Sequence, residues 1–444
     1  MTSVLLAGIL GLHDKGEAYA IVLAVATATT FAATFVVRIV THRLGLVVQP
    51  ATRGVHQLPT ATAGGAAMFV GLLAAMATAS RLPAFEKAFT GSSEPLGVVL
   101  GASVIFTVGL LDDVTKVSRN PKRNGLRKDG VSAPAKVAGQ VLAGTVLYFL
   151  GVTMFYFRIP FAGFVILSPD LAPLATVVWV AVIANAVNLV DGLDGLAAGI
   201  VGIAGLAFFL YGNRLSAVGL LAPDSIGPLV AIIVVGLCLG FLPHNVHPAR
   251  IFMGDAGAML LGLLMASSSL VVGGRIDNPF SGQTFFFLAP IFIPFFVLGV
   301  PIIDSVFAFL RRIVHRSGWS VADKEHIHHR LMRLGHGHRR SVVILWMWTA
   351  ILAALVLFPT YSNKGNPLVL PGIAALGVAM YTVFHPGIRR ARGGEEAEEP
   401  QVGLAAETPA DVGIAIPAIP IRIEDTLPGG VTPIPIDRVG RRRS

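Results

Sequence analysis

Long apolar runs alternate with short polar segments over most of the 444-residue chain. A helix needs about 20 apolar residues to cross the hydrocarbon core of a bilayer. The pattern therefore predicts about eleven transmembrane helices. Their expected bounds are Tyr19–Val40, Gly64–Ala79, Leu96–Leu111, Pro134–Phe157, Ala172–Val190, Leu196–Gly212, Ile226–Pro243, Ala256–Gly273, Phe286–Leu310, Val342–Pro359 and Pro367–Phe384.

The composition excludes an ordinary soluble domain. Hydrophobic residues make up 54% of the chain and charged residues 13%, whereas soluble domains contain about 25% charged residues. The loops after the first, third, fifth, seventh and ninth spans, together with the C-terminal tail, hold most of the 34 lysines and arginines. The positive-inside rule therefore predicts a cytoplasmic C-terminus and an N-terminus outside. This distribution explains the net charge of +9 without a nucleic-acid partner.

We expect residues 1–384 to form an all-α polytopic domain in the cell inner (plasma) membrane. Residues 385–444 would form a cytoplasmic tail. The tail is rich in Pro, Gly and Glu and contains Ile-Pro repeats, a composition typical of disordered segments. Cys238 is the single cysteine, so no internal disulfide is expected.

One polar stretch interrupts the apolar sequence between the fifth and sixth spans. Asn185, Asn188, Asp191 and Asp194 follow one another at three-residue steps, and residues three apart on a helix share a face. Carboxylates at a membrane boundary need a cation or another partner. An ordinary turn between helices is the alternative, since Asp-Gly is a common turn dipeptide. Two Asn and two Asp are more than a turn requires, and this favours a functional site.

A second acidic group, Asp112 and Asp113, ends the third span. Two acids at a helix C-terminus are unfavourable, because that end carries partial negative charge. A divalent cation would reverse this, and Mg²⁺ takes one or two carboxylates together with substrate phosphates. Neutralisation by Lys116, Lys122 and Arg123 is the alternative.

Further polar groups stand at the ends of other spans. Lys136 lies just inside the fourth span, where it could bind phosphate or reach back to the interface. Asn245 and Arg250 precede a Gly254-Asp255 pair. The Asp255 carboxylate is favourable at the start of the eighth span and could simply cap it.

The ninth span and the loop after it carry the last polar groups. We expect Asp304 to pair with a basic residue such as Arg311 or Arg312. The following loop contains His326, His328, His329 and Arg330. Their spacing does not fit a helical zinc site, and the adjacent arginine favours an anion. His336 and His338 are expected to lie in the loop.

Four of these motifs occur in an order that resembles the polyprenyl-phosphate N-acetylhexosamine-1-phosphate transferase family, over about Arg53 to Leu331. They are Asp112-Asp113, Asn185-x-x-Asn188-x-x-Asp191-Gly-x-Asp194-Gly-Leu-Ala, Asn245-x-x-Pro-Ala-Arg-Ile-Phe-Met-Gly-Asp255-x-Gly and His326-Ile-His-His-Arg-Leu. The last motif resembles the bacterial UDP-N-acetylglucosamine branch more than the UDP-N-acetylmuramoyl-pentapeptide branch. Ala258 and Thr62 depart from the residues that many relatives carry.

The resemblance implies transfer of N-acetylglucosamine 1-phosphate from UDP-N-acetylglucosamine to a polyprenyl phosphate, with release of UMP. Mg²⁺, or Mn²⁺ in its place, would be the cofactor. The resemblance implies metal ligands at Asp191, Asp255 and either Asp112 or Asp113. It implies catalytic roles for Asp112, Asp113, Asp191 and Lys136. The substrate contacts that it implies are Lys116, Asn188, Asp194, Asn245, Arg250, His326, His328, His329 and Arg330.

Three other interpretations stay open at this point. They are a muramoyl-pentapeptide transferase, a membrane metalloprotein that uses the His cluster, and a secondary transporter. A transporter also places polar groups in broken helices, but we find no repeated halves in this sequence. A homodimer is compatible with the sequence and is not indicated by it.

Overall fold

The computed structural model describes residues 15–48, 60–117, 130–159, 163–222, 224–273 and 337–361, and residues 372, 374, 375, 377 and 378. Within these residues six helices are long and apolar enough to cross a membrane, or seven if one bent pair forms a single span. The chain is therefore a polytopic, mostly helical protein. The predicted span Phe286–Leu310 lies outside the described residues, and so does most of Pro367–Phe384.

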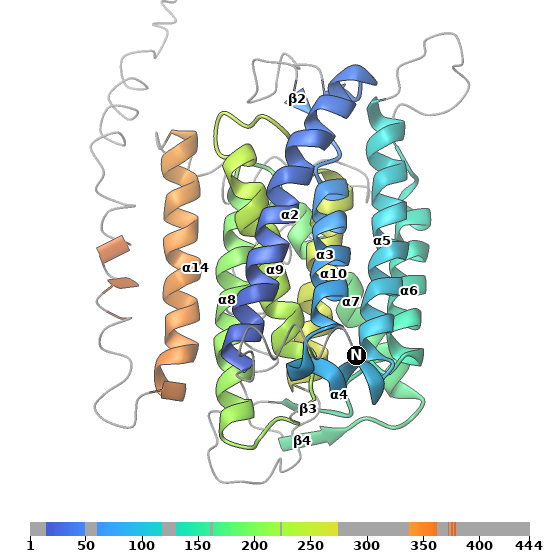
Figure 1. Cartoon of the computed structure of the whole chain (residues 1–444), viewed down its shortest axis with the longest axis vertical. Helices are drawn as coiled ribbons and strands as arrows, with labels where there is room; N and C mark the ends of the chain where they lie inside the picture. The colour runs from blue at the N-terminus through green and yellow to red at the C-terminus, as the bar shows by residue number, and fades with distance from the viewer. Residues whose placement is uncertain are drawn as a thin grey trace, which may run out of the picture. The chain divides into compact units, whose positions relative to one another are not determined.

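The elements follow one another along the chain as shown in Figure 1. The helices are α2 (Lys15–Arg43), α3 (Gly65–Ala79), the short 3₁₀ helix η1 (Pro83–Phe85), α4 (Glu86–Thr90), α5 (Glu94–Val117), α6 (Ala133–Phe149), α7 (Leu171–Val190), α8 (Leu196–Ala217), α9 (Gly227–Asn245), α10 (Gly254–Gly273) and α14 (His338–Tyr361). The strands are β1 (Val47–Val48), β2 (Thr60–Ala61), β3 (Tyr156–Ile159) and β4 (Gly163–Ile166).

Most predicted spans agree with a helix to within a few residues, and two predictions need correction. The fold is not strictly all-α, because β1 pairs with β2 and β3 pairs with β4, both antiparallel. The fourth predicted span ran to Phe157, but α6 ends at Phe149. Gly151 follows with a φ of +90°, a conformation that glycine tolerates and that breaks the helix. The chain then enters β3, although its sequence is still apolar.

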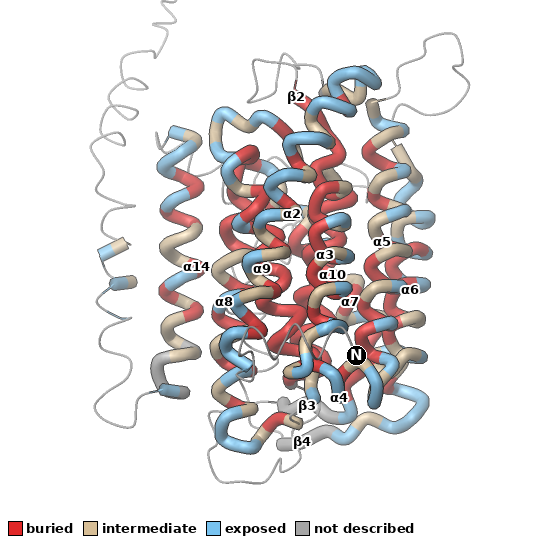
Figure 2. The backbone as a smooth tube through the Cα atoms, viewed as in Figure 1, coloured by how far each residue is buried: buried red, intermediate tan, exposed pale blue. Residues whose placement is uncertain are grey.

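Helices α9 and α10 form the centre of the bundle. In α10, 94% of an 18-residue apolar segment is buried, whereas in α2 only 22% of the corresponding segment is buried. Helix α10 packs against α5 and α7, while α9 packs against α2 and α8. Figure 2 shows the buried residues concentrated on these inner elements. A helix that is apolar all round is typical of such a central position.

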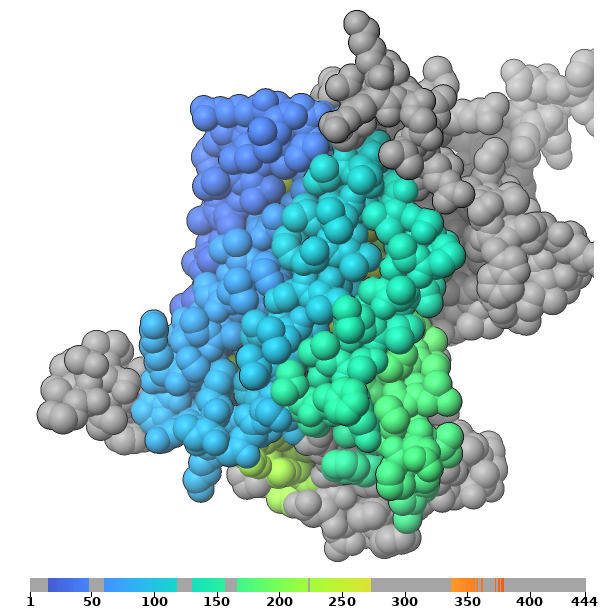
Figure 3. Space-filling view, turned by 90° about the vertical axis from the view of Figure 1, so that its right-hand side faces the viewer, coloured from blue at the N-terminus to red at the C-terminus, as the bar shows by residue number. Residues whose placement is uncertain are grey.

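Large apolar side chains are exposed on the outer helices. Phe31 and Phe35 on α2, Leu142 on α6 and Leu174 on α7 are each about half exposed. Helices α5 and α6 pack against each other, and Figure 3 looks onto the face that they cover. A soluble monomer rarely exposes so much apolar side-chain surface, whereas lipid would cover it in a membrane.

The polar ends of several helices meet at one end of the bundle. Helices α5, α7 and α9 end there, and α6, α8 and α10 begin there, at the top of Figure 1. The parallel bridge between Ala61 and Ile251 joins the start of α3 to the start of α10 at this end. The packing of α10 against α5 and α7 thus brings together acidic residues that are far apart in the sequence.

Candidate functional site

A cavity of about 250 Å³ opens at this polar end of the bundle. Four carboxylates line it, together with one lysine and two asparagines. These residues are Asp113, Asp191, Asp194, Asp255, Lys116, Asn188 and Asn245. Thr62 and Phe252 also contribute to the wall. The excess of negative charge favours a cationic ligand in this cavity.

Asp113 connects α5 to the start of α10. Its Oδ1 accepts a hydrogen bond from the Asp255 N–H at 2.9 Å, and its Oδ2 accepts one from the Ala256 N–H at 3.1 Å. A carboxylate at a helix N-terminus satisfies N–H groups that lack partners within the helix and faces the positive end of the dipole. The cap of α10 is therefore Asp113, and the Asp255 side chain is not used for that purpose.

Gly254 makes this capping arrangement sterically possible. Its φ is +73°, and a Cβ at this position would lie 2.3 Å from Asp113 Oδ2. A side chain here would displace the Asp113 carboxylate from the start of α10. The glycine thus fixes both the cap and the position of the neighbouring Asp255.

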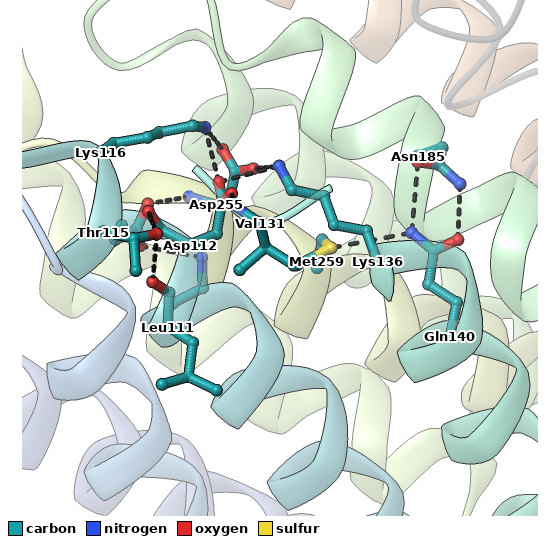
Figure 4. A network of polar contacts seen from close by, with 12 residues as sticks. Leu111, Asp112, Thr115, Lys116, Val131, Lys136, Gln140, Asn185, Asp255 and Met259 are labelled. Atoms are coloured by element: carbon teal, nitrogen blue, oxygen red, sulfur yellow. Dashed lines mark hydrogen bonds and ion pairs between the residues drawn. The ribbon is translucent and has the colours of Figure 1, made fainter. Parts of the chain in front are cut away.

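Two lysines and two aspartates form the ion-pair network in Figure 4. Lys116 Nζ lies 2.6 Å from Asp112 Oδ2 and 3.2 Å from Asp255 Oδ1. Lys136 Nζ lies 2.8 Å from Asp112 Oδ2 and also pairs with Asp255 Oδ2. Asp112 is fully buried, and its Oδ1 accepts a hydrogen bond from the Val131 N–H at 2.8 Å. Asp112 thus mainly orients the two ammonium groups.

An amide pair lies one helical turn beyond Lys136. Gln140 Nε2 donates to Asn185 Oδ1 at 3.2 Å, and Asn185 Nδ2 donates to Gln140 Oε1 at 2.8 Å. Gln140 is buried and Asn185 is exposed. The pair joins α6 to α7 (Figure 4). It accounts for Asn185 without a substrate contact.

Asp191 follows the last residue of α7 and lines the cavity. Burial raises the pKa of its carboxyl to about 7, and the negative charges of Asp255, Asp113 and Asp194 contribute to the same shift. Among the described residues, no lysine or arginine forms an ion pair with it. A cation bound here would stabilise the ionised form.

The turn from Asp191 to Gly195 is held by Asn245 at the end of α9. Asn245 Oδ1 accepts a hydrogen bond from the Gly195 N–H at 2.9 Å, and its Nδ2 donates to the Ile251 carbonyl at 2.9 Å. Asn245 is only 2% exposed. Its side chain therefore positions the turn and also lines the cavity, and the substrate contact expected from the sequence stays a prediction.

Asp194 lies against two histidines that the sequence did not assign to the site. Its Oδ2 accepts hydrogen bonds from His247 Nδ1 at 2.7 Å and from the Ala249 N–H at 3.1 Å. His338 was predicted to lie in a loop, but it is the first residue of α14 and contacts the Asp194 backbone. The two partners lie 53 and 144 residues from Asp194. No local sequence pattern could have indicated either contact.

The donor set of the cavity fits a hard divalent cation. The nearest oxygens of Asp112, Asp113 and Asp255 lie within 4.8 Å of one another, and Asp191 also lines the cavity. Magnesium prefers carboxylate and phosphate oxygens. Asp112 and Asp255 already pair with lysines, so Asp191 is the acid with the greatest need of a cation.

The remaining predicted residues have different outcomes. Asn188 lines the cavity, whereas Arg250 is exposed and is not part of its wall. The other predicted groups lie outside the described residues. They are Asp304, His326, His328, His329, Arg330 and His336.

Comparison with known proteins gives consistent matches. Residues 95–273 match the profile of glycosyl transferase family 4. The chain is 36% identical, over 88% of its length and 95% of the relative, to a decaprenyl-phosphate N-acetylglucosaminephosphotransferase of Mycolicibacterium smegmatis. It is 33% identical, over 74% of its length and 82% of the relative, to a probable undecaprenyl-phosphate N-acetylglucosaminyl 1-phosphate transferase of Bacillus subtilis. A phospho-N-acetylmuramoyl-pentapeptide-transferase of Rubrobacter xylanophilus is 30% identical over 76% of this chain and 96% of its own length.

Proposed function

The chain belongs to glycosyl transferase family 4, and we propose on this basis that it transfers N-acetylglucosamine 1-phosphate from UDP-N-acetylglucosamine to a polyprenyl phosphate. The products are UMP and a polyprenyl-pyrophosphoryl-N-acetylglucosamine. This would be the first membrane step of a cell-envelope polysaccharide. The observation that carries the proposal is the acidic cavity at the polar end of the bundle, in a chain whose relatives are named as such transferases.

The reaction exchanges one phosphoanhydride bond for another. An oxygen of the lipid phosphate attacks the phosphorus that bears the sugar. The bond from that phosphorus to the bridging oxygen breaks, and the electron pair leaves with UMP. Catalysis of such a transfer depends mainly on in-line positioning and charge neutralisation. Both substrates are anionic, so the acidic cavity needs cations before it can hold them.

Asp191 and Asp255 are the proposed ligands of Mg²⁺, with Asp113 beside them at the cavity wall. These carboxylates would hold the ion, which would supply charge neutralisation for the anionic leaving group. Lys116 and Lys136 would contact substrate phosphates, since an ammonium suits phosphate as a point charge. The network that Asp112 forms with both lysines supports this role.

Asn188 and Asp194 are proposed to position the nucleotide or the metal-binding turn. His326, His328, His329 and Arg330 stay proposed phosphate contacts on the strength of their sequence motif alone. Arg250 is a weaker candidate, because its side chain is exposed.

A muramoyl-pentapeptide transferase is the second candidate function. It is favoured by relatives of about 30% identity that carry this name. Relatives with the N-acetylglucosamine name match at 36% identity over more of the chain, and this favours the first candidate. Family membership leaves no support for a transporter.

A transfer assay tests the proposed function directly. Purified protein in detergent should move radiolabel from UDP-N-acetylglucosamine into a lipid extract and release UMP in equal amount. UDP-N-acetylmuramoyl-pentapeptide should be a poor donor. Label transferred only from the pentapeptide donor would establish the second candidate, and no transfer from either would refute both.

We further propose eleven spans, an outside N-terminus and a site on the cytoplasmic face of the plasma membrane. The basic loops support this orientation. A homodimer is compatible with the sequence, and no described contact supports one.

Single cysteines test this orientation in a Cys238→Ala background. Leu44 lies near the end of α2, on the side of the cavity, and Ile166 ends β4 at the opposite end of the bundle. Both side chains are exposed. In intact cells an impermeant thiol reagent should label Ile166→Cys and leave Leu44→Cys unlabelled until the membrane is opened. The reverse result would place the cavity outside the cell.

A further inference from the structure

The first residue of α14 contacts the Asp191–Gly195 turn from a distant part of the chain. The Asp194 backbone N–H donates a hydrogen bond to His338 Nε2 at 3.0 Å. Since Nε2 accepts this bond, it must carry a lone pair and not a proton. The contact is therefore specific to one tautomer of the ring, and a side chain without an acceptor cannot replace it.

A second set of contacts joins α14 to the segment after α9. The rings of His338 and His247 stack with their centroids 4.1 Å apart and their planes at 23°. Arg339 Nε donates to the His247 carbonyl at 3.1 Å. His247 in turn holds the Asp194 carboxylate. The start of α14 thus fixes both the backbone and the side chain of Asp194.

A third contact lies two turns further along α14. The Trp346 indole packs against Gly199, where an added Cβ would lie 2.0 Å from Cε2 of the ring. Its Nε1 also donates to the Leu196 carbonyl at 3.4 Å. Both partners belong to the first turn of α8, which directly follows the Asp191–Gly195 turn. Gly199 is therefore required for α14 to approach α8 this closely.

We propose that three residues of α14, His338, Arg339 and Trp346, hold the Asp191–Gly195 turn in the conformation that directs Asp191 into the cavity. We call these three residues the lock. His338 is its central positioning residue. The inference rests on the proposed function for the role of Asp191. The turn contains Gly192 and Gly195, and glycines leave a backbone free to adopt many conformations. Asn245 restrains one side of this turn, and the lock restrains the other.

Asp194, His247 and His338 could also be considered as a transition-metal site. Their ligand atoms lie within 4.8 Å of one another, and zinc binds imidazole nitrogen and carboxylate oxygen. However, the lone pair of His338 Nε2 is directed at the Asp194 N–H. The geometry therefore favours the lock, and zinc binding becomes an outcome of the test.

Two substitutions of His338 separate the hydrogen bond from the packing. In His338→Gln the amide oxygen stands as many bonds from the backbone as Nε2 does, so it can still accept from Asp194. His338→Leu keeps similar bulk without an acceptor. We expect His338→Leu to speed hydrogen–deuterium exchange in residues 191–195 about tenfold, the effect of losing one buried hydrogen bond. His338→Gln should stay close to the wild type.

Metal binding gives a second readout. Mn²⁺ titration followed by electron paramagnetic resonance should show about tenfold weaker binding for His338→Leu, because Asp191 is less well positioned. The KM for the lipid acceptor should not change. A variant that only lowers the amount of folded protein would reduce the maximal rate and leave the affinity of the remaining sites for Mn²⁺ unaltered.

Gly199→Ala tests the same lock from a position outside the cavity, since the added methyl group displaces Trp346. It should reproduce the His338→Leu effects, and the double variant should be no worse than either single one. Val343→Ala, at an exposed position on α14, is the control and should match the wild type.

Unchanged exchange in residues 191–195 of His338→Leu would overturn the lock whether or not the protein is a transferase. Loss of Zn²⁺ binding in that variant, with Mn²⁺ binding unchanged, would replace the lock by a separate metal site. The wild type could also lack transferase activity while His338→Leu still shows the faster hydrogen–deuterium exchange. That result would refute the proposed function and leave the lock intact.

Discussion

Asp191→Asn should lower kcat on the order of a thousandfold. Such a loss corresponds to about 4 kcal/mol of transition-state stabilisation, which is the scale of the contribution from a bound metal ion. Asp191 lines the cavity and has no lysine or arginine partner among the described residues. Its replacement should therefore affect cation binding without breaking an ion pair. Initial rates with saturating lipid, over a range of Mg²⁺ concentrations, measure the effect.

The same experiment has a control on the same helix. Asp170→Asn changes an exposed aspartate before the opposite end of α7 and should leave the rate unaltered. In the wild type, excess EDTA should abolish transfer, and Mg²⁺ or Mn²⁺ should restore it. Full turnover in excess chelator would exclude the metal role. A fully active Asp191→Asn would move that role to other acids of the cavity.

The pH dependence of cation binding follows from the same carboxylate. Burial raises the pKa of Asp191 to about 7, so this group is mostly protonated below pH 7 and charged above it. A proton then competes with the cation on the acid side. Binding of Mn²⁺ to the wild type should thus weaken as the pH falls below 7, and Asp191→Asn should lack this contribution.

Hydrophobic pattern alone predicted most of the helices. The spans that became α7, α8, α9 and α10 agree with the structure to within a few residues, apart from the end of α8. Their bounds are marked by Asp, Asn and Gly, which interrupt an otherwise apolar sequence. The pattern failed after Gly151, because residues 152–157, which lead into β3, are still apolar. A run of apolar residues indicates that a segment is buried, but it does not distinguish a short strand from the end of a helix.

The acids that the sequence singled out lie close together at one end of the bundle, but the sequence could not assign their partners. Asp112 and Asp113 are adjacent, yet one orients two lysines and the other caps α10. Adjacent helical residues point about 100° apart, and the partners that each one meets depend on where α6 and α10 pack. The contacts of Asp194 with His247 and His338 likewise arise from tertiary packing alone.

Lys136→Gln should reduce catalytic efficiency for the lipid acceptor about 10- to 100-fold. The substitution removes one charge-assisted interaction with phosphate, worth roughly 1.5–3 kcal/mol. The sequence left open whether this lysine only reaches back to the interface. In the structure its ammonium pairs with Asp112 and with Asp255, which lines the cavity, and this favours the phosphate role. Lys87→Gln, at an exposed position on α4, is the matched control and should be as active as the wild type.

Thermal unfolding of the Lys136→Gln variant separates the contribution of this ammonium to stability from its contribution to catalysis. Removing one partner of a buried ion pair leaves the other charge uncompensated. Asp112 is fully buried, but Lys116 would still contact it, so we expect only a modest fall in the melting temperature. The double variant Lys136→Gln/Asp112→Asn should recover that stability and stay impaired in transfer. Recovered activity in the double variant would mean that Lys136 serves only to neutralise Asp112. Normal lipid kinetics with weaker donor binding would instead assign the ammonium to the UDP-sugar.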